Sequence, residues 1–77
     1  MITVLFFAHL QEIAGTDKLT LHVDELTITA LKEKLSNDHG IKNLDQIMFA
    51  INEEYAEGND IVRAGDTVAL IPPVSGG

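Results

Sequence analysis

Residues 27–40 have the sequence TITALKEKLSNDHG, which carries the pattern of a single amphipathic helix. Its apolar residues recur at helical spacing and form one stripe: Ile28, Leu31 and Leu35. Thr27 precedes the stripe as an N-cap residue, and Gly40 follows it as a stop signal. The pattern therefore predicts a helix over about residues 28–38 that packs one side against a core.

Strand patterns flank this helix, two before it and two after it. They cover residues 2–8, 18–23, 48–51 and 67–71. The second strand alternates strictly between polar and apolar residues, as a half-buried strand does, whereas the first and last are apolar on both faces. A short helical turn that ends at Gly15 joins the first two strands, and so short a connection makes them antiparallel.

The order strand, strand, helix, strand, strand predicts an α+β domain with one main helix packed across one face of a mixed sheet. This is the β-grasp, or ubiquitin-like, arrangement, in which the first and last strands run parallel and side by side in the middle of the sheet. We expect the domain to span residues 1–71 and an extended tail to follow over residues 72–77.

The two central strands carry more apolar side chains than one core face requires. The even-numbered set is the more complete and is assigned to the face under the helix: Ile2, Val4, Phe6, Ala8, Val68 and Leu70. Leu5, Phe7 and Ile71 then face outward from adjacent strands. Because exposed apolar patches usually mark binding sites, these three residues are predicted to dock on a partner protein. The alternative is that a loop of the same chain covers them.

Length and charge narrow the class of protein. The chain has 77 residues and no Cys, so we expect one domain without disulfides or a thiolate metal site. The formal net charge of −7 opposes binding to nucleic acid or to an anionic membrane surface. Since we recognise no bilayer span and no signal peptide, we expect a cytoplasmic protein with no nucleic acid or membrane partner.

The sequence shows no conventional set of catalytic side chains. The histidines His9, His22 and His39 are not spaced as metal ligands, and no Cys can complete a site, so no metal centre is predicted. Two pairs of adjacent carboxylates cannot converge across a substrate and are interpreted as solvated charges. The chain is therefore not expected to be an enzyme by itself.

The C-terminal segment carries the one pattern that points to chemistry. It reads Pro72-Pro73-Val74-Ser75-Gly76-Gly77. Two prolines cannot continue a strand and favour an extended geometry, so this segment can reach about 20 Å beyond the last strand. Gly76 and Gly77 lack a Cβ atom and make a tip thin enough for a channel that excludes side chains. The carboxylate of Gly77 is the predicted reactive group.

This ending, preceded by the turn Gly65-Asp66 and an apolar strand, resembles that of the small, sulfur-carrying subunit of molybdopterin synthase. The opening segments, residues 4–8 and 10–15, are similar to the first strand and short helix of the same family. The resemblance covers essentially the whole chain, and its ending is the most specific part.

The resemblance implies a sulfur carrier without a permanently bound cofactor. An E1-like adenylating enzyme would activate the carboxylate of Gly77 with ATP, and a sulfur donor would convert the acyl-adenylate to a thiocarboxylate. The tail would then enter the active site of the large synthase subunit and give its sulfur to a cyclic pyranopterin precursor of molybdopterin. In the family two large and two small subunits form a heterotetramer, and the catalytic residues belong to the partners.

Three alternatives stay open at this point. The sulfur carrier of thiamin thiazole synthesis shares the fold and the Gly-Gly chemistry, although its ending lacks the two prolines. A ubiquitin-like modifier that joins its terminus to protein lysines would keep the same ending. An interaction domain with an inert tail would have no chemistry at Gly77.

Overall fold

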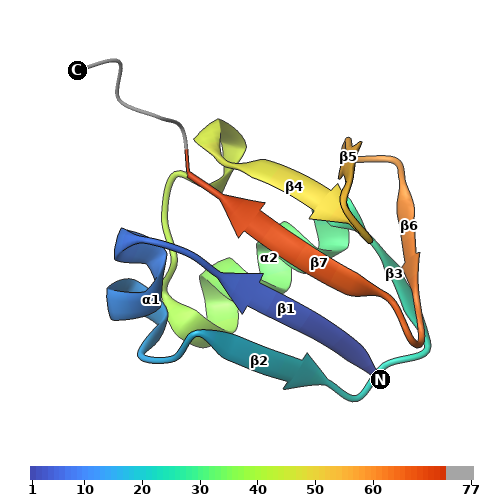
Figure 1. The fold of residues 1–77 in the computed structure, drawn as a ribbon, viewed down its shortest axis with the longest axis horizontal. Coiled ribbons are helices and arrows are strands. Elements are labelled where there is room, and N and C mark those ends of the chain that lie inside the picture. The colour runs from blue at the N-terminus through green and yellow to red at the C-terminus, as the bar shows by residue number, and fades with distance from the viewer. Residues whose placement is uncertain (73–77) are drawn as a thin grey trace.

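The computed structural model describes residues 1–72, which form a sheet with one long helix across one face (Figure 1). In chain order the elements are β1 (Ile2–Phe6), α1 (His9–Ala14), β2 (Lys18–Leu21), β3 (Glu25–Thr27), α2 (Ile28–His39), the 3₁₀-helix η1 (Leu44–Gln46), β4 (Met48–Ile51), β5 (Glu54–Ala56), β6 (Ile61–Arg63) and β7 (Thr67–Ile71).

Within the described part of the chain, five strands form the main sheet in the order β2-β1-β7-β4-β5, and β3 pairs with β6 in a separate two-stranded sheet. β1 and β7 are parallel neighbours at the centre of the main sheet, with Val4 opposite Val68. The neighbouring strands on either side pair with them in the antiparallel sense. The parallel central pair confirms the β-grasp arrangement expected from the order of elements.

The main helix, α2, begins and ends close to where its sequence predicts. The hydroxyl oxygen of Thr27 accepts a hydrogen bond from the backbone N–H of Ala30 at 3.1 Å, which is the expected N-cap. The first two N–H groups of the helix donate to carbonyl oxygens of the 57–60 loop. At the other end Gly40 adopts the left-handed conformation, with φ 66°. The first three N–H groups of the helix are thereby bonded, and the N–H of Gly40 donates to carbonyl oxygens in the last turn.

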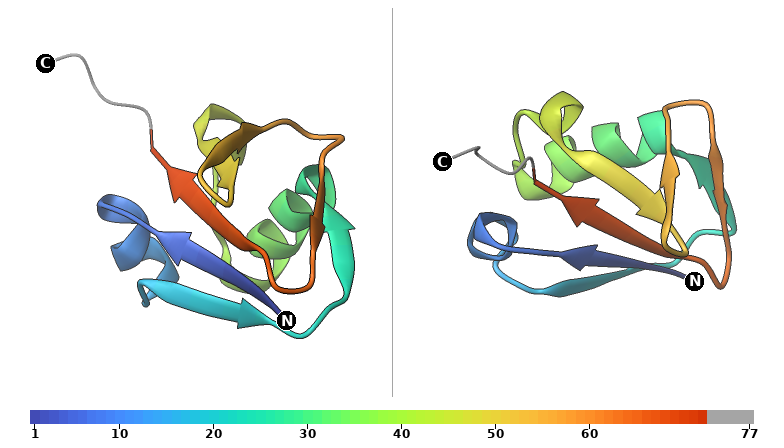
Figure 2. Two further views of the ribbon diagram at one scale, coloured as in Figure 1. Left: turned by 45° about the vertical axis from the view of Figure 1, so that its right-hand side comes forward. Right: turned by 45° about the horizontal axis from the view of Figure 1, so that its top comes forward.

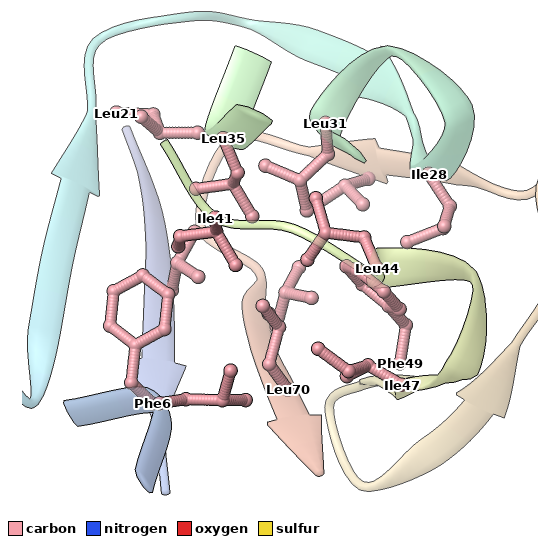
Figure 3. Close-up of a cluster of buried hydrophobic side chains, with 14 of the residues drawn as sticks. Phe6, Leu21, Ile28, Leu31, Leu35, Ile41, Leu44, Ile47, Phe49 and Leu70 are labelled. Atoms are coloured by element: carbon pink, nitrogen blue, oxygen red, sulfur yellow. The ribbon is translucent and has the colours of Figure 1, made fainter. Parts of the chain in front are cut away.

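The core lies between α2 and the inner face of the main sheet (Figure 3). Leu31 and Leu35 are fully buried, as the apolar stripe predicts. The even-numbered residues of the central strands are buried with them: Ile2, Val4, Phe6, Val68 and Leu70. The segment between α2 and β4 contributes three further buried side chains: Ile41, Leu44 and Ile47.

Ala8 departs from the expected core face. It lies beyond the end of β1 and is exposed, because the chain turns there with a φ of 53° and enters α1. The backbone N–H of Leu10 donates to the carbonyl oxygen of Phe7 across this turn. The chain therefore leaves the sheet soon after Phe7. The second strand, β2, also stops before its expected end, at Leu21.

The Leu35→Ala variant is expected to lose roughly 2–5 kcal/mol of unfolding free energy, because it removes buried methyl groups and leaves a cavity. Urea unfolding of the purified chain measures the loss. Glu33→Ala is the matched control, since Glu33 is exposed on the same helix and should change stability by only about 0.5 kcal/mol. Equal stability of the two variants would contradict the packing described here.

Candidate functional site

The outer face of the main sheet lies opposite α2, and among residues 1–72 no helix covers it (Figure 2). A row of facing residues crosses four strands on this face. Leu5 on β1 lies opposite Ala69 on β7. Ala69 in turn lies opposite Ala50 on β4, and Ala50 lies opposite Tyr55 on β5. Because residues paired across strands project from the same face, two small side chains lie between two large ones.

This row forms the middle of a depression of about 880 Å³, which we call the outer-face hollow. Its lining residues are Leu5, Phe7, Ala50, Asn52, Glu53, Tyr55, Thr67, Ala69 and Ile71. Tyr55 is 75% exposed, whereas Ala50 is only 4% exposed. The alanine methyl groups are thus the floor of the hollow, and the larger side chains are its walls.

The three residues predicted from sequence to form a docking patch are brought together in this hollow. Leu5, Phe7 and Ile71 all line it, with Phe7 44% exposed and the other two half-buried. Figure 1 shows no segment of residues 1–72 lying across the outer face of β1 and β7, so the described chain does not provide the covering loop considered above. Their role in binding a partner stays a prediction.

The turn between β4 and β5 forms one wall of the outer-face hollow, and hydrogen bonds of the Asn52 side chain fix its position. Its Oδ1 atom accepts a hydrogen bond from the backbone N–H of Thr67 at 3.0 Å, and its Nδ2 atom donates to Oδ1 of Asp66 at 2.9 Å. The Asp66 carboxylate also accepts from the backbone N–H of Arg63. The bond from Arg63, followed by that from Asn52, lowers the pKa of Asp66 below its usual value. The wall is therefore tied to the start of β7 by the hydrogen bond from Thr67, and to the residue before β7 by a charge-assisted hydrogen bond to Asp66.

The predicted tail begins beside the hollow. β7 ends at Ile71, which lines the hollow, and Pro72 follows it half-buried. Residues 73–77, including the predicted reactive Gly77, lie outside the described residues. The described chain thus places the root of the tail next to the predicted docking patch.

Other kinds of site find no support in the described structure. Within residues 1–72, no group of three His, Asp or Glu side chains is placed to hold a metal ion. None of the helices described here combines the length and the apolar character needed to cross a membrane. The outer-face hollow gathers the three predicted docking residues beside the end of β7, and we take it, with the predicted tail, as the candidate functional site.

The parallel central strands, the single helix across one face and the open opposite face define a ubiquitin-like β-grasp protein. A family model described as "ThiS family" matches residues 4–77. The chain belongs to this family.

Relatives named molybdopterin synthase sulfur carrier subunit align along nearly the whole chain. The one from Drosophila melanogaster is 37% identical over 81 residues, covering 99% of this chain and 90% of the relative. The one from Escherichia coli is 35% identical and covers 100% of both chains.

Solved structures show the same fold. The crystal structure of small archaeal modifier protein 1 from Haloferax volcanii superposes with a TM-score of 0.84 at 31% identity, covering 99% of this chain and 98% of the other. A protein-protein complex of subunits 1 and 2 of the molybdopterin-converting factor from Helicobacter pylori contains a chain that superposes with a TM-score of 0.71 at 24% identity, covering 99% of this chain and 97% of the other. At that identity the second likeness concerns the fold alone.

Sequence reasoning missed most of the hollow. The floor residues Ala50 and Ala69 and the wall residues Asn52, Glu53 and Tyr55 were not predicted as site residues. Tyr55 did carry a usable signal, because it is an isolated aromatic residue in an otherwise polar turn region. The alanines carried none, since their importance comes from the register that places them opposite each other.

Proposed function

We propose that this chain is the sulfur-carrying small subunit of a molybdopterin synthase. The observation that carries the proposal is the alignment with the sulfur carrier subunit of Escherichia coli, which extends over the full length of both chains. The aligned length spans the Pro72-Pro73-Val74-Ser75-Gly76-Gly77 ending, on which the proposed chemistry depends. The same observation favours this carrier over that of thiamin thiazole synthesis.

The proposed chemistry takes place on the carboxylate of Gly77. A carboxylate is a poor electrophile, because its oxygen is a poor leaving group. An E1-like adenylating enzyme attaches AMP from ATP to a carboxylate oxygen, with release of pyrophosphate. Hydrosulfide supplied by a sulfur donor then attacks the acyl carbon and displaces AMP, which leaves a thiocarboxylate on Gly77. The chain presents the reacting group, and the partners supply the catalytic residues.

The large synthase subunit is the second proposed partner. The tail enters its active site and transfers sulfur to a cyclic pyranopterin precursor, while the outer-face hollow docks on its surface. Support comes from the position of Phe7 and Ile71, which line the hollow beside the root of the tail. One docked surface can therefore aim the tail. Two large and two small subunits are proposed for the assembled enzyme.

Intact mass spectrometry tests the central step. The purified chain is incubated with the adenylating enzyme, ATP and a sulfur donor. Its mass is expected to rise by the difference between one sulfur and one oxygen atom, with the change located on Gly77 by fragmentation. Omission of ATP is the control and should leave the mass unchanged. An unchanged mass in the complete mixture, with an enzyme that loads a known carrier, would refute the proposal.

A second candidate function is that of a protein modifier. It is favoured by the 31% identity and TM-score of 0.84 with small archaeal modifier protein 1. In this case a lysine Nζ atom attacks the adenylated carbonyl carbon of Gly77, displaces AMP with loss of a proton, and forms an isopeptide bond. Trypsin cleaves after Lys and Arg, and Arg63 is the last such residue of this chain, so digestion of cellular protein would yield lysines that carry residues 64–77 as a branched remnant. A thiocarboxylate without such remnants would favour the sulfur carrier alone.

A further inference from the structure

The outer-face hollow has a shape and a charge that fit one kind of partner surface. We propose that its alanine floor receives a bulky apolar side chain of the partner protein, and that Glu53 on its rim binds a neighbouring basic side chain of the same partner. The inference rests on the proposed function, which makes the large synthase subunit the partner.

The cross-strand row gives the hollow a narrow floor between two larger side chains. Ala50 and Ala69 face each other in the middle of the sheet, with Leu5 on one side and Tyr55 on the other. A side chain inserted between these walls would contact both methyl groups and bury part of the Tyr55 ring. Aromatic residues that become buried in a fitted pocket contribute most of the energy of many protein interfaces. The floor is therefore expected to determine which partner residue fits.

The lining of the hollow carries negative charge. Among residues 1–72, Glu53 is the one charged residue that lines the hollow, and Glu54 follows it in the chain. A basic group of the partner would be attracted to this rim, and an acidic one would be repelled. A second copy of this chain is a poor occupant for the same reason, since each copy carries a net charge of −7.

The backbone at Glu53 supplies an independent argument. Asn52 and Glu53 are the central residues of the β4–β5 turn, and both have positive φ, at 50° and 73°. A hairpin turn of this kind favours Asn followed by Gly, because glycine adopts positive φ without steric cost. Glu53 occupies the position that favours glycine, so its backbone is strained. Strained backbone of this kind is concentrated at functional sites. The turn thus holds a carboxylate on the rim at the expense of its own stability.

Ala69→Leu tests the shape, because the longer side chain would fill the floor. The affinity for the large subunit, measured by isothermal titration calorimetry, is expected to fall by about tenfold or more, as in an overpacked contact. Thr20→Leu is the matched control, since Thr20 is exposed on the same face of β2 and lies outside the hollow. It should stay within about twofold of wild type. If Ala69→Leu does not fold, Ala69→Val takes its place, with a smaller loss expected.

Glu53→Gln tests the charge. Its association with the large subunit should be slower than that of wild type at low salt and should depend less on ionic strength, because steering by the carboxylate is lost. Glu57→Gln makes the same change of charge at an exposed residue outside the hollow, and it should associate as wild type does. Glu53→Gly should also associate more slowly, yet raise the thermal unfolding midpoint of the isolated chain by relieving the turn.

The outcomes separate this inference from the proposed function. If the wild-type chain does not bind the large subunit, both fail. If wild type binds and Ala69→Leu binds equally well, the proposed function stands and the alanine floor is refuted. Equal salt dependence for Glu53→Gln and wild type refutes the basic contact. A dimer of the isolated chain that Ala69→Leu disrupts would make a second copy the occupant and would also overturn the inference.

Discussion

A chain that carries one extra residue after Gly77 is expected to fold and to bind the large subunit, yet to deliver no sulfur. The proposed chemistry consumes a free carboxylate on Gly77, and a peptide bond at this position removes the group that reacts with ATP. Deletion of Gly77 should have the same effect, because the new terminal carboxylate would end about 3.5 Å short of the reacting atoms. Product formed by the reconstituted synthase is the measurement, with binding of each variant followed separately.

Two substitutions within the tail should have graded effects that can be compared with this complete loss. Pro72→Ala should give a partial loss of product, since Pro72 orients the tail and does not react. Gly76→Val, loaded with sulfur beforehand where this is possible, should reduce turnover more than binding, because a branched side chain obstructs a narrow channel. Sulfur delivery by a lengthened chain that has not been trimmed would show that the terminal carboxylate of Gly77 is not the carrier.

The parts of the fold that could be predicted from sequence are those with local signals. α2 has a capping threonine, an apolar stripe and a terminal glycine, and all three act as expected in the structure. β4 and β7 also have the predicted bounds. The three-residue strands β3, β5 and β6 were missed, because three residues are too few to establish an alternation. The pairing of β3 with β6 joins residues far apart in the chain, such as Leu26 and Val62.

The candidate site likewise contains residues with a local sequence signal and residues without one. Leu5, Phe7 and Ile71 could be predicted because each lies on the surplus apolar face of a central strand. The hollow itself could not, because it depends on the lateral register that sets Ala50 against Ala69. The alternation of apolar residues fixes which face each side chain of a strand occupies. Which residue of β4 lies opposite which residue of β7 depends on the packing of the whole sheet, because no short turn joins these two strands.

Phe7→Asp is expected to abolish stable binding of the large subunit while the isolated chain stays folded. Phe7 is 44% exposed, so a carboxylate at this position remains hydrated in the free chain. In the proposed complex the same carboxylate would be buried without a partner. Protein mutations that bury an uncompensated polar group cost about 3 kcal/mol. A loss of that size weakens binding by more than about a hundredfold, and burying a full charge costs more.

The measurement is the affinity of Phe7→Asp for the large subunit, with circular dichroism and thermal unfolding of the isolated chain beside it. Thr20→Asp is the matched control, because it places a carboxylate on the same face of the sheet outside the hollow. It should bind within about twofold of wild type. Phe7→Leu keeps an apolar side chain at the position and should bind far better than Phe7→Asp. Normal binding by Phe7→Asp, or unfolding of the isolated variant, would show that this face is not the docking surface, and the tail would then have to be aimed from elsewhere.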